Sequence, residues 1–263
     1  MKIIDIHSHI QFPDYVDEVG SVIARMKEKK VGTIVVGTDL KSSRDAVLLA
    51  EKYENVYASV GLHPNDVFEE DFDVGEFRKL VDNRKTVAIG ECGLDYFRTQ
   101  KTEENKEKQK EVLEKQIDLA VEFDLPLMIH CREAYDDLIE IFDEQKKKYG
   151  TKLRGNIHFF AGSWDIARKF LRLNFTLSFT GVITFTSDYD EVIKNIPLDK
   201  IMVETDSPFV SPVPHRGKRN EPVYVEEVIK QIAKLKDIKI EELELVLLDN
   251  SKRVFGIQQQ SQH

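Results

Sequence analysis

The stretch that decides the fold is IIDIHSH, residues 3–9, in which a short apolar run ends in two histidines separated by one residue. A short run of β-branched apolar residues predicts a buried strand. Alternate residues of a strand point the same way, so both imidazoles can face one side and hold one cation. Two such histidines alone are often structural, and the rest of the chain has to decide between these interpretations.

Similar apolar runs recur along the chain, separated by turn signals and by amphipathic, charged stretches. The eight runs are Ile3–Ile6, Thr33–Val36, Val56–Val60, Thr86–Ile89, Leu125–Ile129, Gly155–His158, Phe175–Phe179 and Ile201–Val203. The spacing between their ends suits one strand plus one helix, which predicts an α/β fold, a TIM (β/α)8 barrel in a single domain over residues 1–257. Residues 258–263 are predicted to form a disordered tail. A doubly wound open sheet is disfavoured, because no glycine-rich phosphate motif follows the first strand.

The stretches between these runs predict helices. The candidates are Val16–Lys29, Ser42–Lys52, Glu104–Phe123, Ala134–Lys147, Trp164–Arg172 and Glu226–Leu235, the last being the final helix after Asp206. In Glu104–Phe123, apolar residues three and four positions apart predict one buried stripe. Its members are Val112, Leu113, Ile117, Ala120 and Val121.

The composition indicates an enzyme more than a nucleic-acid coat. The 263 residues carry a net charge of −9, whereas proteins that coat nucleic acid are usually basic. A polyanionic substrate stays possible if divalent cations and local arginines attract it. The first residues lack the apolar stretch of a signal peptide, no segment has membrane-spanning length, and the two cysteines are too few for a disulfide framework. We therefore expect a cytoplasmic protein with no obligate protein partner.

Ionisable residues gather at the ends of the predicted strands. They are His7, His9, His63, Glu91, His130, His158 and Asp206. Strand ends of a barrel converge on one rim, so residues some 200 positions apart become neighbours. Glu91 could bridge two metals, with His130 and His158 on the second cation, and Asp206 could complete the first site and orient or deprotonate a water. The alternatives are a salt bridge for Glu91, core histidines and structural acids; Glu204 is a candidate partner for a histidine.

Other residues near these ends are candidates for binding substrate. His63 could contact the substrate or the charge on a leaving group, or simply pack on Pro64. The Pro/Gly-punctuated loop 212–222 brings His215 and Arg216 to the predicted rim. Arg216 and Arg132 could bind phosphate oxygens through their guanidinium groups, against the alternative of a solvated charged loop. Cys92 and Cys131, each one residue past a predicted ligand, should point to the opposite strand face as small core residues.

At this point the chain resembles the TatD family of metal-dependent deoxyribonucleases, within the amidohydrolase-like barrels. The matching blocks, in chain order, are DIHSH (5–9), GLHP (61–64), GECGLDY (90–96), IHCREA (129–134), ETDSP (204–208) and RGKRNEP (216–222). One departure is HFFAG (158–162), where the family commonly has a cysteine and a serine after the histidine. The ligand itself is kept, so the departure affects substrate packing.

The resemblance implies a TIM-like barrel and hydrolysis of phosphodiesters with two divalent metals, often as a 3′→5′ exonuclease on DNA. Mg²⁺ or Mn²⁺ would support activity, and Zn²⁺ or other metals could also occupy the sites. By analogy, one metal is held by His7, His9, Glu91 and Asp206, and the other by Glu91, His130 and His158. His63 and the Arg216 loop would contact the substrate. Some relatives act on D-aminoacyl-tRNA, which makes a deacylase one alternative.

The proposed chemistry is attack of a metal-activated water on a terminal phosphodiester, with Asp206, Glu91 and His63 as the catalytic residues and the substrate held by His63, Arg132, His215 and Arg216. A rim site on an acidic protein favours strand ends over mid-duplex cleavage. A metal-dependent amidohydrolase acting on a cyclic amide or lactone is a rival, although many of those use a modified lysine on the fourth strand, where this chain has Glu91. A non-catalytic metal-bearing scaffold is disfavoured because all six metal ligands are present.

Overall fold

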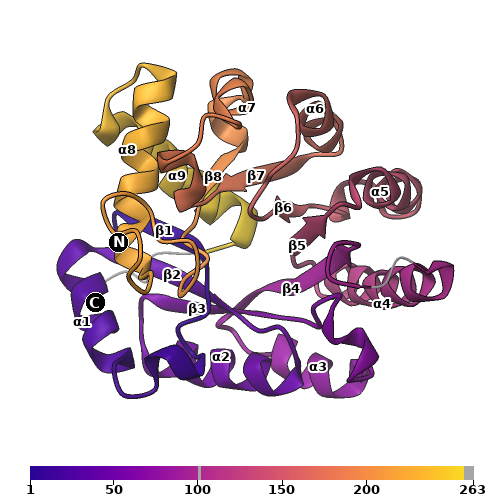
Figure 1. Ribbon diagram of the computed structural model, residues 1–263. Helices are drawn as coiled ribbons and strands as arrows, with labels where there is room; N and C mark the ends of the chain where they lie inside the picture. Colours follow the sequence, from indigo (N-terminus) through magenta and orange to yellow (C-terminus); the bar gives the residue numbers. More distant parts are fainter. Residues whose placement is uncertain (100–101, 258–263) are drawn as a thin grey trace.

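Eight parallel strands form a closed barrel in the computed structural model, which describes residues 1–99 and 102–257 (Figure 1). The strands are β1 (Ile3–Ser8), β2 (Val31–Val36), β3 (Val56–Val60), β4 (Thr86–Asp95), β5 (Leu127–Arg132), β6 (Gly155–Ile157), β7 (Phe175–Phe179) and β8 (Ile201–Val203). They follow one another around the sheet in sequence order. A bridge between Ser8 and Ser207 joins the end of the sheet back to β1. The predicted single-domain (β/α)8 TIM barrel is confirmed, and each predicted apolar run overlaps a strand.

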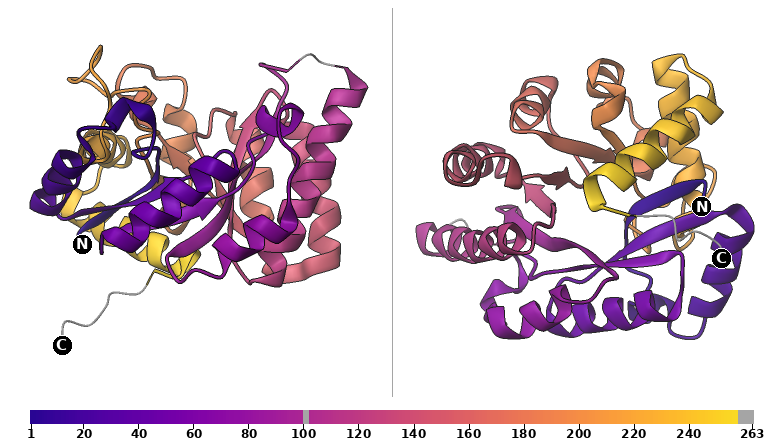
Figure 2. Two further views of the ribbon diagram at one scale, coloured as in Figure 1. Left: turned by 90° about the horizontal axis from the view of Figure 1, so that it is seen from below. Right: turned by 180° about the vertical axis from the view of Figure 1, so that it is seen from behind.

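Helices surround the barrel on its outer face (Figures 1 and 2). They are α1 (Val19–Lys29), α2 (Leu40–Lys52), α3 (Val74–Val81), α4 (Glu103–Glu122), α5 (Tyr135–Tyr149), α6 (Trp164–Arg172), α7 (Asp190–Asn195), α8 (Val225–Lys236) and α9 (Ile240–Phe255). Short 3-10 turns fill several connections, among them η2 (Asp66–Phe68) and η4 (Gly181–Thr184). Every predicted helix overlaps an observed one. The expectation of one final helix after Asp206 is wrong, because both α8 and α9 follow β8.

Helix α4 shows why these segments become helices that pack on the sheet. The Thr102 side chain accepts a hydrogen bond from the Asn105 amide at 3.2 Å, which caps the helix and satisfies one of its free N–H groups. The predicted apolar stripe is buried along its whole length, from Val112 to Val121. Each large apolar side chain buried in this way stabilises the fold by about 1.5–3 kcal/mol. Packing of the stripe therefore holds the helix against the barrel.

The apolar core has two layers. The outer layer lies between the strands and the surrounding helices and contains most of the buried apolar side chains. The inner layer fills the barrel interior, with Ile4 and Ile6 of β1 and Met202 of β8, and continues onto α9 through Val254 and Phe255. Helix α9 crosses one end of the barrel (Figure 2, right panel, yellow). The barrel is thus packed and covered at that end, which leaves the opposite strand ends for polar groups.

Three sequence expectations can be compared directly with this fold. Cys92 is buried in the outer apolar layer and Cys131 packs against that layer, as expected for small core residues. Within residues 1–99 and 102–257, no helix is long and apolar enough to cross a membrane. The predicted disordered tail, residues 258–263, lies outside the described residues.

Candidate metal centre

The ends of β1 and β8 bring the first set of candidate ligands together. The Asp206 amide donates to the His7 carbonyl at 3.0 Å, so two residues about 200 positions apart share one edge of the barrel. The His7 and His9 Nε2 atoms are 3.1 Å apart, and the Asp206 Oδ1 atom lies 3.7 Å from the first and 3.5 Å from the second. Both imidazoles are buried. Three donor atoms thus converge on one point.

Glu91 lies between this set and a second one. Its Oε2 atom is 3.4 Å from His7 Nε2 and 3.8 Å from His9 Nε2. Its Oε1 atom is 2.9 Å from both His130 Nδ1 and His158 Nε2, and 3.4 Å from His63 Nε2. The carboxylate therefore presents one oxygen to each set of imidazoles.

Strand β4 owes this placement of Glu91 to an irregularity. The register between β4 and β5 shifts between Ile89 and Cys92, both of which point into the outer apolar layer. A shift of this kind breaks the strict alternation of side chains and re-aims one of them. Gly90 has a φ of +138°, and a Cβ atom there would lie 2.2 Å from the Met128 carbonyl oxygen. Only glycine permits this conformation and close approach, so Gly90 is what lets Glu91 turn into the barrel mouth.

Both sets of donor atoms have the chemistry and spacing of a metal site. Two ligands that each lie about 2.1 Å from one cation, at bond angles near those of a tetrahedron or octahedron, are about 3.0–3.4 Å apart. The donor-to-donor distances around Glu91 cover 2.9–3.8 Å. Among the residues that the structure describes, three groups of candidate ligands have donor atoms within 4.8 Å of one another: His7–Glu91–His158, His7–His9–Asp206 and His63–Glu91–His130. The residues present therefore fit divalent cations.

The second ring nitrogen of three of these histidines is also engaged. His9 Nδ1 lies 2.8 Å from the Val36 carbonyl oxygen, which can only accept, so its N–H is on Nδ1 and Nε2 is free for a metal. His158 Nδ1 lies 3.3 Å from Glu204 Oε1, and Glu204 is the residue that the sequence suggested as a partner for a histidine. His130 Nε2 lies 3.1 Å from Asp95 Oδ2. Carboxylates and carbonyls in these positions fix the orientation and tautomer of a ligating imidazole.

Asp95 is a functional candidate that the sequence reasoning missed. It lies at the end of β4 within the GECGLDY block, and its second oxygen accepts hydrogen bonds from the Phe97 and Arg98 amides, each at 2.9 Å. The GECGLDY motif could have drawn attention to Asp95, but the spacing of residues along the chain does not show that Asp95 reaches His130. The contact depends on the turn that follows β4.

Burial and mutual charge shift the pKa values of the site in opposite directions. Burial alone would raise the pKa of Glu91, but the surrounding imidazoles, led by His158 and His63, hold it well below its usual range. Burial lowers the pKa values of His7 and His63. Burial would raise the pKa of Asp206, but the hydrogen bond from His9 and the charges of His7, His158 and His9 together lower it below its usual value. Burial would lower the pKa values of His9, His130 and His158, but their carboxylate neighbours raise these values above the usual one. A cation would bind the deprotonated imidazoles and so displace these protons.

His63 has a defined proton position. The Asn65 amide donates to His63 Nδ1 at 3.1 Å, so Nδ1 is the acceptor and the neutral ring carries its proton on Nε2. That Nε2 atom is the one that faces Glu91. His63 thus presents an N–H group to the middle of the site.

The remaining predicted substrate-binding residues lie at the end of β5 (Arg132) and in the loop after β8 (His215 and Arg216). The Arg132 guanidinium lies 3.7 Å from the centre of the Phe97 ring, and that of Arg216 lies 4.0 Å from the centre of the Phe185 ring. The His215 imidazole stacks on Tyr224 at 3.7 Å between ring centres. In the same loop Arg219 pairs with Glu18 at 2.8 Å, which ties this arginine to α1. Contact of Arg132, His215 and Arg216 with substrate stays a prediction.

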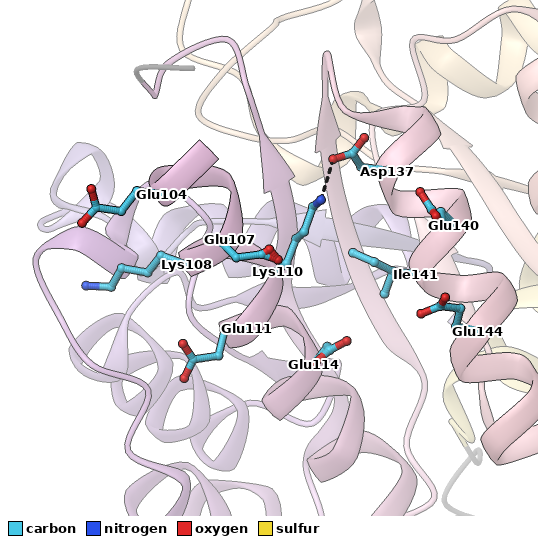
Figure 3. A pocket seen from close by; sticks show the side chains of 10 residues that line it. All are labelled: Glu104, Glu107, Lys108, Lys110, Glu111, Glu114, Asp137, Glu140, Ile141 and Glu144. Carbon is cyan, nitrogen blue, oxygen red and sulfur yellow. Dashed lines mark ion pairs between the residues drawn. The ribbon is translucent and has the colours of Figure 1, made fainter. Parts of the chain in front are cut away.

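A groove on the outside of the barrel differs from this centre in character. It runs between α4 and α5 and is lined mostly by acidic side chains, with an ion pair of 2.9 Å between Lys110 and Asp137 (Figure 3). Its acidic lining would repel a phosphate group. The strand ends, with their converging donors, are therefore the candidate site.

Imidazoles and carboxylates that converge at the carboxyl ends of barrel strands define the class of metal-dependent hydrolases built on a TIM barrel. A comparison with family models narrows this class. The model described as "TatD related DNase" matches residues 4–256. The chain therefore belongs to the TatD family of metal-dependent hydrolases, as its motifs indicate.

Individual relatives agree with this membership over the whole barrel. The chain is 42% identical over 258 residues to the uncharacterized metal-dependent hydrolase YabD of Bacillus subtilis, covering 96% of this chain and 98% of the relative. It is 35% identical over 263 residues to YcfH of Escherichia coli, another uncharacterized metal-dependent hydrolase, covering 98% and 97%. The crystal structure of YJJV, a TatD homolog from Escherichia coli, is 28% identical and superposes with a TM-score of 0.88 over 98% of this chain and 99% of that one.

Proposed function

We propose that this chain is a divalent-metal-dependent phosphodiesterase that removes nucleotides from the 3′ ends of DNA, with two cations at the strand ends. One observation carries the proposal: the two oxygens of Glu91 face two separate sets of imidazoles. The first cation would be held by His7, His9, Glu91 and Asp206, and the second by Glu91, His130 and His158. When bound, the two cations would lower the pKa of a water and offset the negative charge that develops on the phosphate.

The side chains around these positions supply the proton transfers. Asp206 is ionised at neutral pH, because its pKa lies below the usual value, and it can orient the attacking water and accept its proton. The water adds to phosphorus as the bond from phosphorus to the 3′ oxygen breaks. His63 Nε2–H faces this position and can donate to the departing 3′ oxygen. Each proton thus has a named acceptor or donor.

A phosphate ester is favoured over an amide or lactone by two features of the rim. The bridging position holds a carboxylate, Glu91, and the end of β5 and the loop after β8 present the exposed guanidinium groups of Arg132 and Arg216. A guanidinium group binds two phosphate oxygens at once, whereas an uncharged cyclic amide offers these arginines no anion. DNA ends, bound transiently, are the proposed partner, and Mg²⁺ or Mn²⁺ the proposed metals.

The test is digestion of a 5′-labelled single-stranded DNA oligonucleotide with Mg²⁺, Mn²⁺ or EDTA. Wild type should produce a ladder that shortens from the 3′ end, and EDTA should abolish it. Glu91→Ala should lower the rate by about 10³-fold or more, since it removes a group that acts on the transition state. Glu140→Ala, an exposed glutamate of α5, is the matched control and should cleave like wild type.

Two results would contradict the proposal. Cleavage of a circular single strand as fast as a linear one would exclude action at ends. Absence of any cleavage by folded, metal-loaded wild type would remove DNA as the substrate, and D-aminoacyl-tRNA and dihydroorotate-like cyclic amides would then be assayed with the same variants.

A further inference from the structure

We propose that three exposed phenylalanines at the barrel mouth, Phe97, Phe185 and Phe209, stack on the unpaired bases of the strand whose terminal phosphate lies at the metal centre. The inference rests on the proposed function and adds to it the residues that hold the bases. A single exposed apolar side chain is common, but several at the same end of a barrel mark a candidate binding surface, and these three residues are 54%, 45% and 50% exposed. All three follow the ends of barrel strands: β4, β7 and β8.

The first of these rings is tied to a metal ligand. The Phe97 amide donates to Asp95 Oδ1 at 2.9 Å, and Asp95 Oδ2 lies 3.1 Å from His130 Nε2. The exposed Arg132, two residues past His130 at the end of β5, places its guanidinium 3.7 Å from the centre of the Phe97 ring. A planar cation stacked on an aromatic ring offers a flat surface to a base and a positive charge to a phosphate.

The second ring repeats this arrangement elsewhere on the mouth. Phe185 follows η4, the turn after β7, and the exposed Arg216 guanidinium lies 4.0 Å from its centre. Arg216 is held by a 2.9 Å hydrogen bond to the Ser211 carbonyl, and the Val213 amide donates to Thr184 Oγ1 at 2.9 Å. The two Arg–Phe pairs are therefore three strands apart around the barrel.

The third ring lies beside the metal centre itself. Phe209 closes a turn in which its amide donates to the Asp206 carbonyl at 2.9 Å. Its ring centre is 6.3 Å from that of His9, on which the Phe12 ring stacks at 4.6 Å. A base that stacks on the exposed face of Phe209 would lie next to the position of the scissile phosphate.

This combination predicts which substrates bind well. Aromatic platforms interleaved with cations hold single strands with little sequence preference, because every base has a flat face. A paired base keeps its faces within the duplex and cannot use the platforms. The site should therefore require a base at the 3′-terminal positions, tolerate any of the four, and bind a blunt duplex weakly.

The test compares each phenylalanine with leucine, which keeps apolar bulk, and with tryptophan, which keeps the ring. The substrates are a single-stranded oligonucleotide and the same strand with tetrahydrofuran abasic sites at its last three positions. Loss of one base–aromatic stack should raise KM by roughly 5- to 100-fold with kcat nearly unchanged. Each leucine variant should raise KM for the intact strand by part of this factor and should change KM for the abasic strand little. The three variants are Phe97→Leu, Phe185→Leu and Phe209→Leu. Tryptophan should restore the wild-type KM.

Binding measured without turnover makes the result independent of the metal chemistry. Fluorescence anisotropy with the Glu91→Ala protein should give the same loss of affinity when a leucine substitution is added. Leu245→Ala, which truncates a 67% exposed side chain on α9, is the control and should change neither KM nor Kd. If wild type hydrolyses the intact and abasic strands equally well, the stacking proposal is wrong while the phosphodiesterase proposal stands. If wild type hydrolyses neither strand, the phosphodiesterase proposal is what fails.

Discussion

The two mouths of the barrel are formed by the same eight strands, but one is lined by ionisable groups and the other by apolar side chains. At the carboxyl ends of the strands, buried carboxylates and imidazoles face one another around Glu91. At the opposite end, aliphatic residues of the strands pack against Val254 and Phe255 of α9. The first arrangement costs folding free energy unless cations compensate it, whereas the second stabilises the fold directly. Function and stability are thus assigned to opposite ends, as is general for this fold.

The largest expected effect is at the apolar mouth. Phe255 is 2% exposed, so Phe255→Ala should lower the free energy of unfolding by about 3–5 kcal/mol through lost burial and the cavity left behind. Urea denaturation measures this loss. Leu245→Ala on the same helix should change it by less than about 0.5 kcal/mol. If the two ends of the barrel act independently, the folded fraction of Phe255→Ala should keep the wild-type kcat. A drop in kcat would show that the two ends are coupled.

A smaller effect is expected just outside the metal ligands. Asp95→Asn keeps an oxygen for the Phe97 and Arg98 amides but turns an N–H group toward His130 Nε2. That nitrogen would then have to accept, which moves the imidazole proton to Nδ1, the atom that faces Glu91 and the metal. Metal affinity should fall by about 10- to 100-fold, measured by competition with a chelating dye.

The control for this substitution lies on the outside of the barrel. Asp137→Asn alters a carboxylate that accepts from Tyr96 Oη and Lys110, both at 2.9 Å, and metal affinity should not change. Equal losses in the two variants would mean that Asp95 acts on the fold and not on His130.

The smallest effect concerns the charge at the catalytic mouth. Burial, together with the negative charge of Asp39, raises the pKa of Asp66 to about 6. The folded state then binds the proton more tightly than the unfolded state, so stability falls as pH rises from about 4 to about 6. Asp66→Asn should remove this loss and so raise the free energy of unfolding at neutral pH. The gain should be less than about 1 kcal/mol, because the carboxyl group is only half-buried. Unfolding of the metal-free protein should show the gain at pH 7.5 and none at pH 4, and an equal gain at both would exclude a charge effect.

Regular alternation explains how much of the site could be predicted. On β5, Met128 points into the inner layer, and two residues on His130 reaches the site from the same face. Past the end of β8, Glu204 keeps the period of Met202, and Asp206 follows in a turn with a φ of +55°. For these strands, the alternating sequence pattern and the geometry of a barrel are enough to predict which side chains face the site.

Strands β1 and β4 are where simple alternation fails. Ile89 points into the outer layer, so strict alternation would send Glu91 outward, and the register shift after Ile89 is what turns it in. A similar shift separates Asp5 from Ser8 on β1, where Ile6 and the adjacent His7 both reach the inside. The motif resemblance includes Glu91 and His7 but does not reveal this cause. The position of Asp95 and the surroundings of the exposed phenylalanines depend on loop conformation. Loops have no repeating sequence pattern from which their conformation could be predicted.

The hydrogen bonds that join the two ends of the sheet have a consequence for the order of synthesis. The Asp5 carboxylate accepts from the amide and hydroxyl of Thr205, at 2.8 and 2.6 Å, across 200 residues of chain. During translation from the N-terminus, His7 and His9 emerge early but their partner Asp206 appears only after most of the chain has left the ribosome. The metal position proposed for these residues would therefore be completed in the last stage of folding, and high-affinity metal uptake would mark the moment at which the barrel has closed.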